Sequence, residues 1–254
     1  MNTRIQLRPR RSGFTLIELL VVIAIIGVLA GMIVPATVKA LGKAKAAKAR
    51  TEIASIVGAI KGYQADYSRL PASPATREAH AAKGAYANTL FGNGTPDFVF
   101  GTYNASNLVS VPRFQEIGDP NSARQPNNSE VMAMLTASQF PDSVNASLVV
   151  NANNNQNPKR NVYLNVKVVP RNNPGGMDDL GVYRDPWGRP YIILLDLDYD
   201  NRVLSPFPLV RNNVPQPRFI PDSVLVMSLG PDGKANLGLE EGHPENRDNI
   251  YSWK

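Results

Sequence analysis

An uncharged apolar run near the N-terminus constrains the fold of this chain more than any other feature. The twenty residues from Leu19 to Val38 contain no Asp, Glu, Lys or Arg. As an α-helix rising about 1.5 Å per residue, they span roughly the 30 Å hydrocarbon layer of a membrane. A buried helix of a water-soluble protein is the alternative, but such helices are seldom this long and apolar on every face. The run therefore predicts a membrane-spanning helix.

Basic residues stand on both sides of this run. Four arginines and no acid precede Phe14, and five basic residues follow the run between Lys39 and Arg50. Because the two groups are similar in size, the positive-inside rule does not decide the orientation. From residue 51 onward, 18 basic residues face 20 acidic ones, so the overall charge of +6 does not extend to the body of the chain. No aromatic residues alternate with the lysines, and we do not expect a nucleic-acid partner.

One acid, Glu18, stands at the start of the apolar run. A cleaved secretory signal would have an apolar stretch of only about 7 to 15 residues, so this run is too long for one. A carboxylate at the centre of a membrane helix costs on the order of 2.5 to 3.5 kcal/mol, and less near an interface. Such a group usually has a partner, and Glu18 therefore predicts a cation close to it in the membrane.

The segment Arg11-Ser-Gly-Phe-Thr-Leu-Ile-Glu18 resembles the processing signature of type IV prepilins, and within that family it is similar to the major pseudopilin of type II secretion systems. In that family the prepilin peptidase cuts after the glycine, and the new N-terminal amine is methylated. The resemblance implies a cleaved cytoplasmic leader over residues 1–13 and a cut between Gly13 and Phe14. The ammonium of Phe14 would then neutralise Glu18 of a neighbouring subunit in a filament.

Three further residues of the apolar run suit a helix that leaves lipid for a bundle of helices. Gly27 and Gly31 form a small-xxx-small pair that allows two helices to approach closely. The alternative is that glycine is simply frequent in membrane helices. Pro35 removes a backbone donor and should kink or loosen the helix, and the family has a proline at the equivalent place. Together with Glu18, we assign these residues to filament assembly.

Beyond the membrane the pattern becomes amphipathic. Apolar residues spaced for one face of a helix continue the run: Ile53, Ile56, Val57, Ile60 and Tyr67. We expect one long helix over residues 14–67, membrane-spanning over 14–38, whose second part packs on a domain below it. Prolines at positions 71 and 74 end this helix, and residues 68–254 form a globular head.

The middle of the head, residues 85–180, is rich in asparagine, serine and proline. The cap-forming residues 127–130 predict a short helix through 131–137. Residues 153–158 are interpreted as an exposed turn or loop, and the alternating segment 162–169 predicts a β-strand. The resemblance says least about this section, which we expect to carry the individual specificity of the protein.

The segment Asp185-Pro-Trp-Gly-Arg-Pro-Tyr191 is similar to the D-P-W-G-x-P-Y segment of major pseudopilins. Its turn residues lead into a predicted strand over 191–198, and a second predicted strand covers 224–229. We interpret Trp187 as a core residue beside the turn rather than as a ligand-binding residue.

The C-terminal part, from Ser228-Leu-Gly-Pro-Asp-Gly233 onward, is similar to the loop in which the same family binds calcium. The resemblance assigns Ca²⁺ to the Leu229 carbonyl, Asp232, Asn246 and Asp248, and oxygen ligands suit this hard cation. Asn246 departs from the family, which commonly has aspartate there, and the lost charge weakens or removes the site. Acidic residues at 240, 241 and 245 either compensate or only solvate the loop.

A second acidic pattern, Asp196-Leu-Asp-Tyr-Asp200, resembles the start of an EF-hand loop. The sixth position is Asn201 instead of glycine and the twelfth is Phe207 instead of glutamate, so the rest of that motif fails. We favour solvated charges that block pairing at a sheet edge, with a weak ion site as the alternative.

The chain contains no cysteine and only two histidines, which excludes disulfides, thiolate chemistry and a multi-histidine metal centre within one subunit. Nucleophile-elbow, phosphate-loop and HExxH patterns are absent from the sequence, and we expect no enzymatic activity. A membrane-anchored periplasmic hydrolase that uses two distant carboxylates is the competing class, because carboxylates can meet from anywhere in a fold.

The combined expectation is an α+β, pilin-like fold: a long N-terminal helix packed on an antiparallel β-sheet head with long loops. The resemblance implies a pseudopilin that polymerises with itself and other pseudopilins at an inner-membrane assembly platform and drives protein export. A pilin of a type IV pilus, serving adhesion, motility or DNA uptake, is the alternative. The chain would cross the inner membrane once, with its head on the periplasmic or extracellular side, before it enters a filament.

Overall fold

The computed structural model describes residues 14–82, 97–101, 128–141, 149–171, 173–212, 214–236 and 239–254. By its internal contacts the chain divides into an N-terminal unit, Met1–Ala44, and a C-terminal unit, Lys45–Lys254. The helix α1, Leu16–Tyr67, runs from the first unit into the second.

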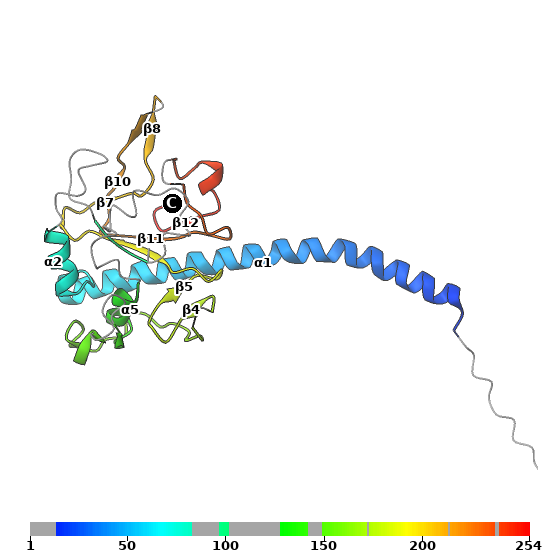
Figure 1. Cartoon of the computed structure of the whole chain (residues 1–254), viewed down its shortest axis with the longest axis horizontal. Helices are drawn as coiled ribbons and strands as arrows, with labels where there is room; N and C mark the ends of the chain where they lie inside the picture. The colour runs from blue at the N-terminus through cyan, green and yellow to red at the C-terminus, as the bar shows by residue number, and fades with distance from the viewer. Residues whose placement is uncertain are drawn as a thin grey trace, which may run out of the picture. The chain divides into compact units, whose positions relative to one another are not determined.

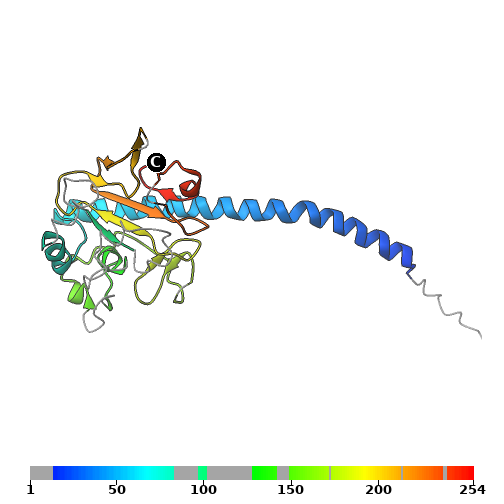
Figure 2. The ribbon, with the colours of Figure 1, turned by 45° about the horizontal axis from the view of Figure 1, so that its top comes forward.

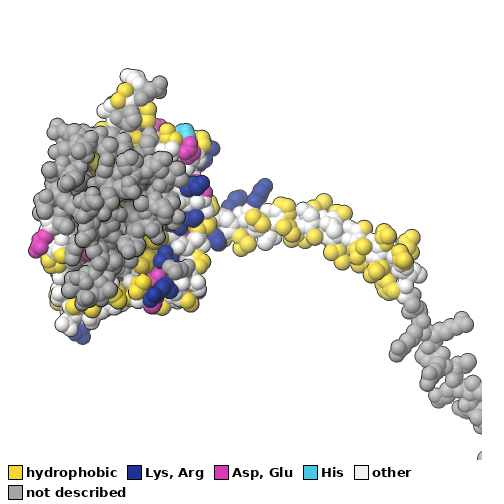
Figure 3. All heavy atoms as spheres, in the orientation of Figure 1, with side chains coloured by type: hydrophobic (Ala, Val, Ile, Leu, Met, Phe, Trp, Pro, Cys, Tyr) yellow, Lys and Arg dark blue, Asp and Glu magenta, His cyan; other side chains and the backbone are white. Residues whose placement is uncertain are grey.

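In the N-terminal unit, every described side chain from Phe14 to Ala44 is exposed. Figure 3 shows that most of the side chains along this part of α1 are hydrophobic. Its most apolar 18-residue window has a mean hydropathy of 2.9, and within the described residues α1 is the one helix long and apolar enough to cross a membrane. Such a surface is unfavourable in water because each exposed apolar area costs free energy of hydration.

In the C-terminal unit, the rest of α1 packs on the core. Ile53, Ile56 and Ile60 are buried, while Val57 and Tyr67 are partly buried against the same core. The predicted helical stripe is therefore confirmed, since residues three and four apart lie on one face of a helix. The core that this face covers includes side chains from α5, β6 and β11.

The centre of the C-terminal unit is a four-stranded antiparallel sheet in the order β1-β6-β11-β12 (Figure 2). Its strands are β1 (Phe98–Phe100), β6 (Ile192–Leu195), β11 (Val224–Ser228) and β12 (Ile250–Tyr251). The strands predicted over 191–198 and 224–229 are present as β6 and β11, each shorter than expected. Both are buried on both faces, so that alternate side chains of each strand enter two different apolar clusters.

The remaining elements are short (Figure 1). The helices are α2 (Pro74–Ala82), α5 (Ser129–Leu135) and the 3₁₀-helices η2 (Ala152–Asn154) and η3 (Pro244–Asn246). Two-stranded antiparallel ladders join β2 (Phe140–Pro141) to β3 (Val149–Val150), β4 (Gly176–Met177) to β5 (Tyr183–Arg184), β7 (Val203–Leu204) to β10 (Phe219–Ile220), and β8 (Leu209–Arg211) to β9 (Val214–Gln216). A long apolar helix followed by antiparallel sheets confirms the α+β class.

The helix predicted over 131–137 is α5, which begins two residues earlier and is buried along its whole length. Asn128 precedes it, but the Asn128 side chain does not cap the helix. Its amide group donates to the carbonyls of Tyr183 and Tyr191, and its oxygen accepts from the Tyr183 N–H. Asn128, which resembled a helix cap, is therefore a buried residue whose hydrogen bonds link β5 to the residue before β6.

The strand predicted over 162–169 is wrong. Within this segment only Val168 makes a β-bridge, with Met177. The N–H groups of Tyr163 and Leu164 both donate to the Leu135 carbonyl at the end of α5. Alternating apolar residues also suit an extended segment that packs on a helix. Residues 162–169 form such a segment at the end of α5.

The exposed loop predicted at 153–158 is also wrong in part, because Asn154, Gln156 and Asn157 are buried. Asn157 Nδ2 donates to the Met134 carbonyl at 2.8 Å, and Asn151 Nδ2 donates to the Ala133 carbonyl at 3.2 Å. The amide groups of these asparagines thus donate hydrogen bonds to carbonyls near the end of α5, which would otherwise be buried without a partner.

Candidate functional site

The tip of α1 is closed by a reciprocal pair of side chains, Thr15 and Glu18. The Thr15 N–H donates to Glu18 Oε2 at 2.8 Å, and the Thr15 hydroxyl donates to the same oxygen at 2.7 Å. The Glu18 N–H lies 3.3 Å from Thr15 Oγ1. This is a capping box, in which side chains satisfy N–H groups that the first helical turn leaves unpaired. Thr15 was not among the predicted site residues, although its Thr-x-x-Glu spacing with Glu18 signals a capping box.

Glu18 borders a shallow apolar hollow of about 360 Å³, lined also by Phe14, Ile17, Val21 and Val22. Phe14 is 77% exposed, so the tip is an uncovered apolar surface with one carboxylate on it. In a membrane such a carboxylate requires hydrogen-bond donors or a cation. Thr15 supplies donors from within the chain and no charge. Gly13 and the leader 1–13 lie outside the described residues.

The other residues assigned to assembly lie further along the exposed part of α1. A Cβ built on Gly27 or Gly31 meets nothing within 4 Å, so both glycines lie on open surface. The helix continues without interruption through Pro35, and Pro35 lacks the N–H that would reach the Gly31 carbonyl. The Gly31 carbonyl, which lacks its usual helical donor, and the absence of side chains at Gly27 and Gly31 leave the helix backbone accessible to another helix.

The turn at Asp185 joins the sheet to the C-terminal loop. Asp185 Oδ1 accepts from the N–H groups of Trp187 and Arg189, both at 2.9 Å, and Asp185 Oδ2 accepts from the Ser228 hydroxyl at 2.6 Å. Burial raises the pKa of Asp185. Trp187 packs partly buried against the core, which agrees with a structural role for this segment.

The four residues that the resemblance assigns to calcium do not share one function in the structure. The Leu229 carbonyl accepts from the Gly233 N–H, and Asp248 Oδ2 lies 3.4 Å from the Asp232 N–H. Burial and the charge of Asp232 raise the pKa of Asp248. The side chain of Asn246, by contrast, is buried and bound to the backbone of residues 236 and 240.

Asn246 therefore does not fit the ligand role. Its Nδ2 donates to the carbonyls of Asn236 and Glu240 at 2.9 Å and lies 3.4 Å from that of Leu239, while its Oδ1 accepts from the Asn236 N–H. A ligand for Ca²⁺ must instead present a free oxygen lone pair to the ion.

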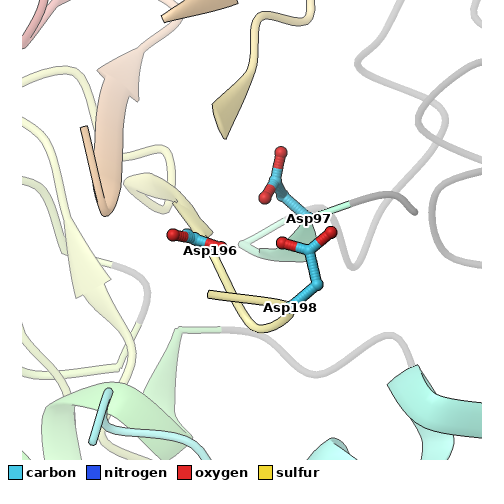
Figure 4. A group of neighbouring side chains, drawn as sticks. All are labelled: Asp97, Asp196 and Asp198. Carbon is cyan, nitrogen blue, oxygen red and sulfur yellow. The ribbon is translucent and has the colours of Figure 1, made fainter. Parts of the chain in front are cut away.

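Figure 4 shows a second acidic group, formed by Asp97 before β1 and by Asp196 and Asp198 after β6. One carboxylate oxygen from each lies within 4.8 Å of the others, and Asp97 and Asp196 are buried. The interpretation of Asp196 as a solvated edge charge is therefore wrong. Asp97 belongs to none of the motifs in the sequence, so only the pairing of β1 with β6 reveals its place.

Burial and the neighbouring carboxylates raise the pKa of Asp97 to about 8, although it accepts a hydrogen bond from the Leu204 N–H. Burial and Asp198 raise the pKa of Asp196 to about 6, although Asp196 accepts from the N–H groups of Asp200 and Asn201. Protonation relieves the repulsion between buried carboxylates.

A groove of about 670 Å³ lies between the second part of α1 and the C-terminal strand. Three basic side chains line it, Arg50, Arg247 and Lys254, together with Asn249 and Tyr251. Among the described residues that line it, none carries a side-chain carboxylate or an imidazole.

Comparison with known proteins identifies the N-terminal segment. The prokaryotic N-terminal methylation motif matches residues 8–34. A type II secretion system core protein G of Pseudomonas aeruginosa is 37% identical over 76 residues, which are 30% of this chain and 54% of that protein. The corresponding protein of Aeromonas hydrophila is 41% identical over 64 residues, 25% of this chain and 45% of that protein. The type IV major pilin protein PilA of Myxococcus xanthus is 39% identical over 61 residues, 24% of this chain and 28% of that protein.

No solved structure matches this chain. The matched region spans about half the length or less of each of these relatives, so the similarity leaves most of the head without a counterpart. The chain carries the prokaryotic N-terminal methylation motif and is similar, in about a quarter to a third of its length, to core proteins G of type II secretion and to a type IV pilin.

Proposed function

We propose that this protein is a pseudopilin, a structural subunit that polymerises into the pseudopilus of a type II secretion system and drives protein export. One observation carries the proposal: an exposed apolar helix bears a single carboxylate, Glu18, at its tip, inside a matched methylation motif. Several relatives are type II secretion system core proteins G, which supports the choice of system.

The chemistry of the tip explains how the subunit would assemble. The prepilin peptidase would remove residues 1–13 and release an ammonium at Phe14, which is then methylated. Glu18 is held by the neutral donors of Thr15, so a cation offered by a neighbouring subunit adds a charge interaction that Thr15 does not supply. In a low-dielectric environment this ion pair is far stronger than in water. It therefore favours the staggered helix packing in which the two groups meet.

The rest of the exposed helix would form the filament core. Before assembly it would cross the inner membrane once, with the head on the periplasmic or extracellular side, where an assembly platform adds subunits to the growing filament. Gly27, Gly31 and Pro35 lie on open surface and would allow close approach between helices. Other pseudopilins would join through the same surface. The role is mechanical, and we propose no enzymatic activity.

A type IV pilus is the second candidate, favoured by the similarity to the major pilin PilA. The two candidates share processing and helix packing and differ in the machine that recruits the subunit. Deletion of the host's type II secretion platform separates them. A pseudopilin loses its filament in that strain, and a pilin keeps it.

The test begins with processing. Intact mass and N-terminal sequencing of the membrane-extracted protein are expected to show a mature chain that begins with methylated Phe14. A chain that keeps Met1 in cells with an active prepilin peptidase contradicts the proposal.

Assembly is tested separately with Glu18→Gln, which removes the charge and keeps the shape. We expect processed subunits that remain in the membrane and a loss of sheared filaments. Glu78→Gln is the matched control, because Glu78 is an exposed acid on α2, remote in sequence from the tip. Filament yields that are equal for the two variants would refute a role for the Glu18 charge.

A further inference from the structure

We propose that the C-terminal loop, residues 229–236 and 239–249, is closed by the guanidinium of Arg189 and the amide of Asn246, in place of the calcium ion that the resemblance implies. This inference concerns the head alone and does not depend on the filament role.

Arg189 provides the positive charge at the first half of the loop. Its Nη1 donates to the Gly230 carbonyl at 3.1 Å and lies 3.5 Å from that of Pro231, while its Nη2 donates to the Asp232 carbonyl at 3.2 Å. Three successive carbonyls are thus directed at one cation. A guanidinium presents several N–H donors in a fixed plane and can satisfy them together, as a hard metal ion would.

The position of Arg189 is fixed by the turn that precedes β6. Its backbone N–H donates to Asp185 Oδ1 at 2.9 Å, and its carbonyl accepts from the Asp185 N–H at 2.8 Å. Asp185 is itself held by the Ser228 hydroxyl at the end of β11. The backbone of Arg189 is therefore held in place beside the sheet, and its side chain reaches the loop from a fixed position.

Gly233 makes room for the guanidinium. Its φ is +68°, a conformation that favours glycine, and a Cβ at this position would lie 1.7 Å from Arg189 Nε. The loop backbone thus lies directly against the arginine side chain. Gly230, with φ of +61°, makes a similar approach on the other side, where a Cβ would lie 2.3 Å from the Asp248 carbonyl oxygen.

Asn246 closes the second half of the loop. Its two amide hydrogens are directed at the carbonyls of residues 236, 239 and 240, and its oxygen accepts from the Asn236 N–H. An aspartate at this position would place a carboxylate against those carbonyls and could bind them only through a cation. Asparagine instead supplies N–H donors directly, so the amide that departs from the family pattern suits a loop without metal.

Asp232 and Asp248 remain as the carboxylates that calcium could still use. Asp232 Oδ1 accepts from the Lys234 N–H, and the backbone carbonyl of Asp232 is bound to Arg189. A calcium ion near these two residues would have to accept the guanidinium as a close neighbour of like charge, which weakens its binding.

The experiment uses the full-length protein in detergent micelles and follows thermal unfolding by tryptophan fluorescence, because both tryptophans, Trp187 and Trp253, lie in the head. We expect the wild-type Tm to be the same in millimolar calcium chloride and in excess chelator. Arg189→Gln is expected to lower the Tm by roughly 3 to 10 °C, since hydrogen bonds from a charged group are lost. Arg171→Gln is the control, because Arg171 is an exposed arginine paired with Asp179 outside the loop.

Results of two kinds, on calcium and on the Arg189 variants, would overturn the proposal. One is a wild-type Tm that falls in chelator, or saturable calcium binding by calorimetry at micromolar affinity. The other is an Arg189→Gln variant no less stable than Arg171→Gln. Should Arg189→Gln fail to fold, Arg189→Lys provides the measurement: it keeps the charge but loses the planar set of donors, and we expect a smaller fall in Tm that calcium does not restore. A Tm of Arg189→Lys equal to that of wild type would contradict the proposal.

Discussion

Asp97 makes the stability of the head depend on pH. Its pKa is raised from 3.8 to about 8, chiefly by burial, and the carboxylates of Asp196 and Asp198 add to the shift. Between about pH 4 and pH 8 the folded protein therefore holds a proton that the unfolded chain has released. The folded state binds more protons, so the free energy of unfolding falls as the pH rises through this window. The contribution is complete below about pH 4 and lost above about pH 8.

The magnitude follows from the same shift. One proton of difference corresponds to a slope of about 1.4 kcal/mol per pH unit. Over a window of about four units, the upper limit is about 5 kcal/mol. The pKa of Asp196, raised to about 6, adds a second contribution of the same sign below about pH 6, so the total slope of wild type is expected to be steeper there.

The assay is urea unfolding of the full-length protein in detergent at pH 5 and pH 8, followed by tryptophan fluorescence. Asp97→Asn replaces the carboxyl by a neutral amide whose oxygen still accepts the Leu204 N–H. We expect wild type to lose more stability than Asp97→Asn between the two pH values, by about 2 to 4 kcal/mol. Glu78→Gln, on the exposed face of α2, is expected to follow wild type. An equal loss in wild type and Asp97→Asn would refute the assignment of a buried, protonated Asp97.

Three further substitutions test the packing of the head and the tip of α1. Asn128→Ala removes three hydrogen bonds to the backbone of Tyr183 and Tyr191 and is expected to lower the free energy of unfolding in urea by about 2 to 3 kcal/mol. Its control is Asn155→Ala, at an exposed position, which should change stability by less than about 0.5 kcal/mol. Ile60→Ala opens a cavity under α1 and should cost about 2 to 5 kcal/mol in the same titration, so a loss below about 1 kcal/mol would contradict its burial. Thr15→Val removes the hydroxyl of the capping box and should destabilise the first helical turn by about 1 kcal/mol, measured as faster amide exchange in micelles; unchanged exchange would show that the box does not form.

The parts of this fold that depend on neighbouring residues could be predicted from the sequence. The stripe from Ile53 to Tyr67 follows from helical spacing, whereas the uncharged run and the strands β6 and β11 follow from the length of an apolar run and the turn residues beside it. The candidate site at the tip was predictable for the same reason, since Glu18 stands alone within a short motif.

The features that were missed depend on residues distant in the sequence. Asp97 meets Asp196 only because β1 pairs with β6, and Arg189 reaches the C-terminal loop only because the turn at Asp185 is held to the end of β11. The same reason explains the error at 153–158. Asparagine is common in exposed turns, but its amide can also bind two backbone groups inside a protein, and composition does not distinguish the two uses.

Hydrogen bonds from buried asparagine side chains hold the loops of the head in place. Asn128, Asn151, Asn157 and Asn246 each bind backbone groups in the interior, in a chain that has no cysteine. These amide contacts are indifferent to oxidants, reductants and moderate acid. These contacts are sensitive to deamidation, because hydrolysis of one such amide removes its N–H donors and leaves a carboxylate where no water can solvate it. A subunit altered in this way is expected to unfold as a whole rather than loosen at one loop.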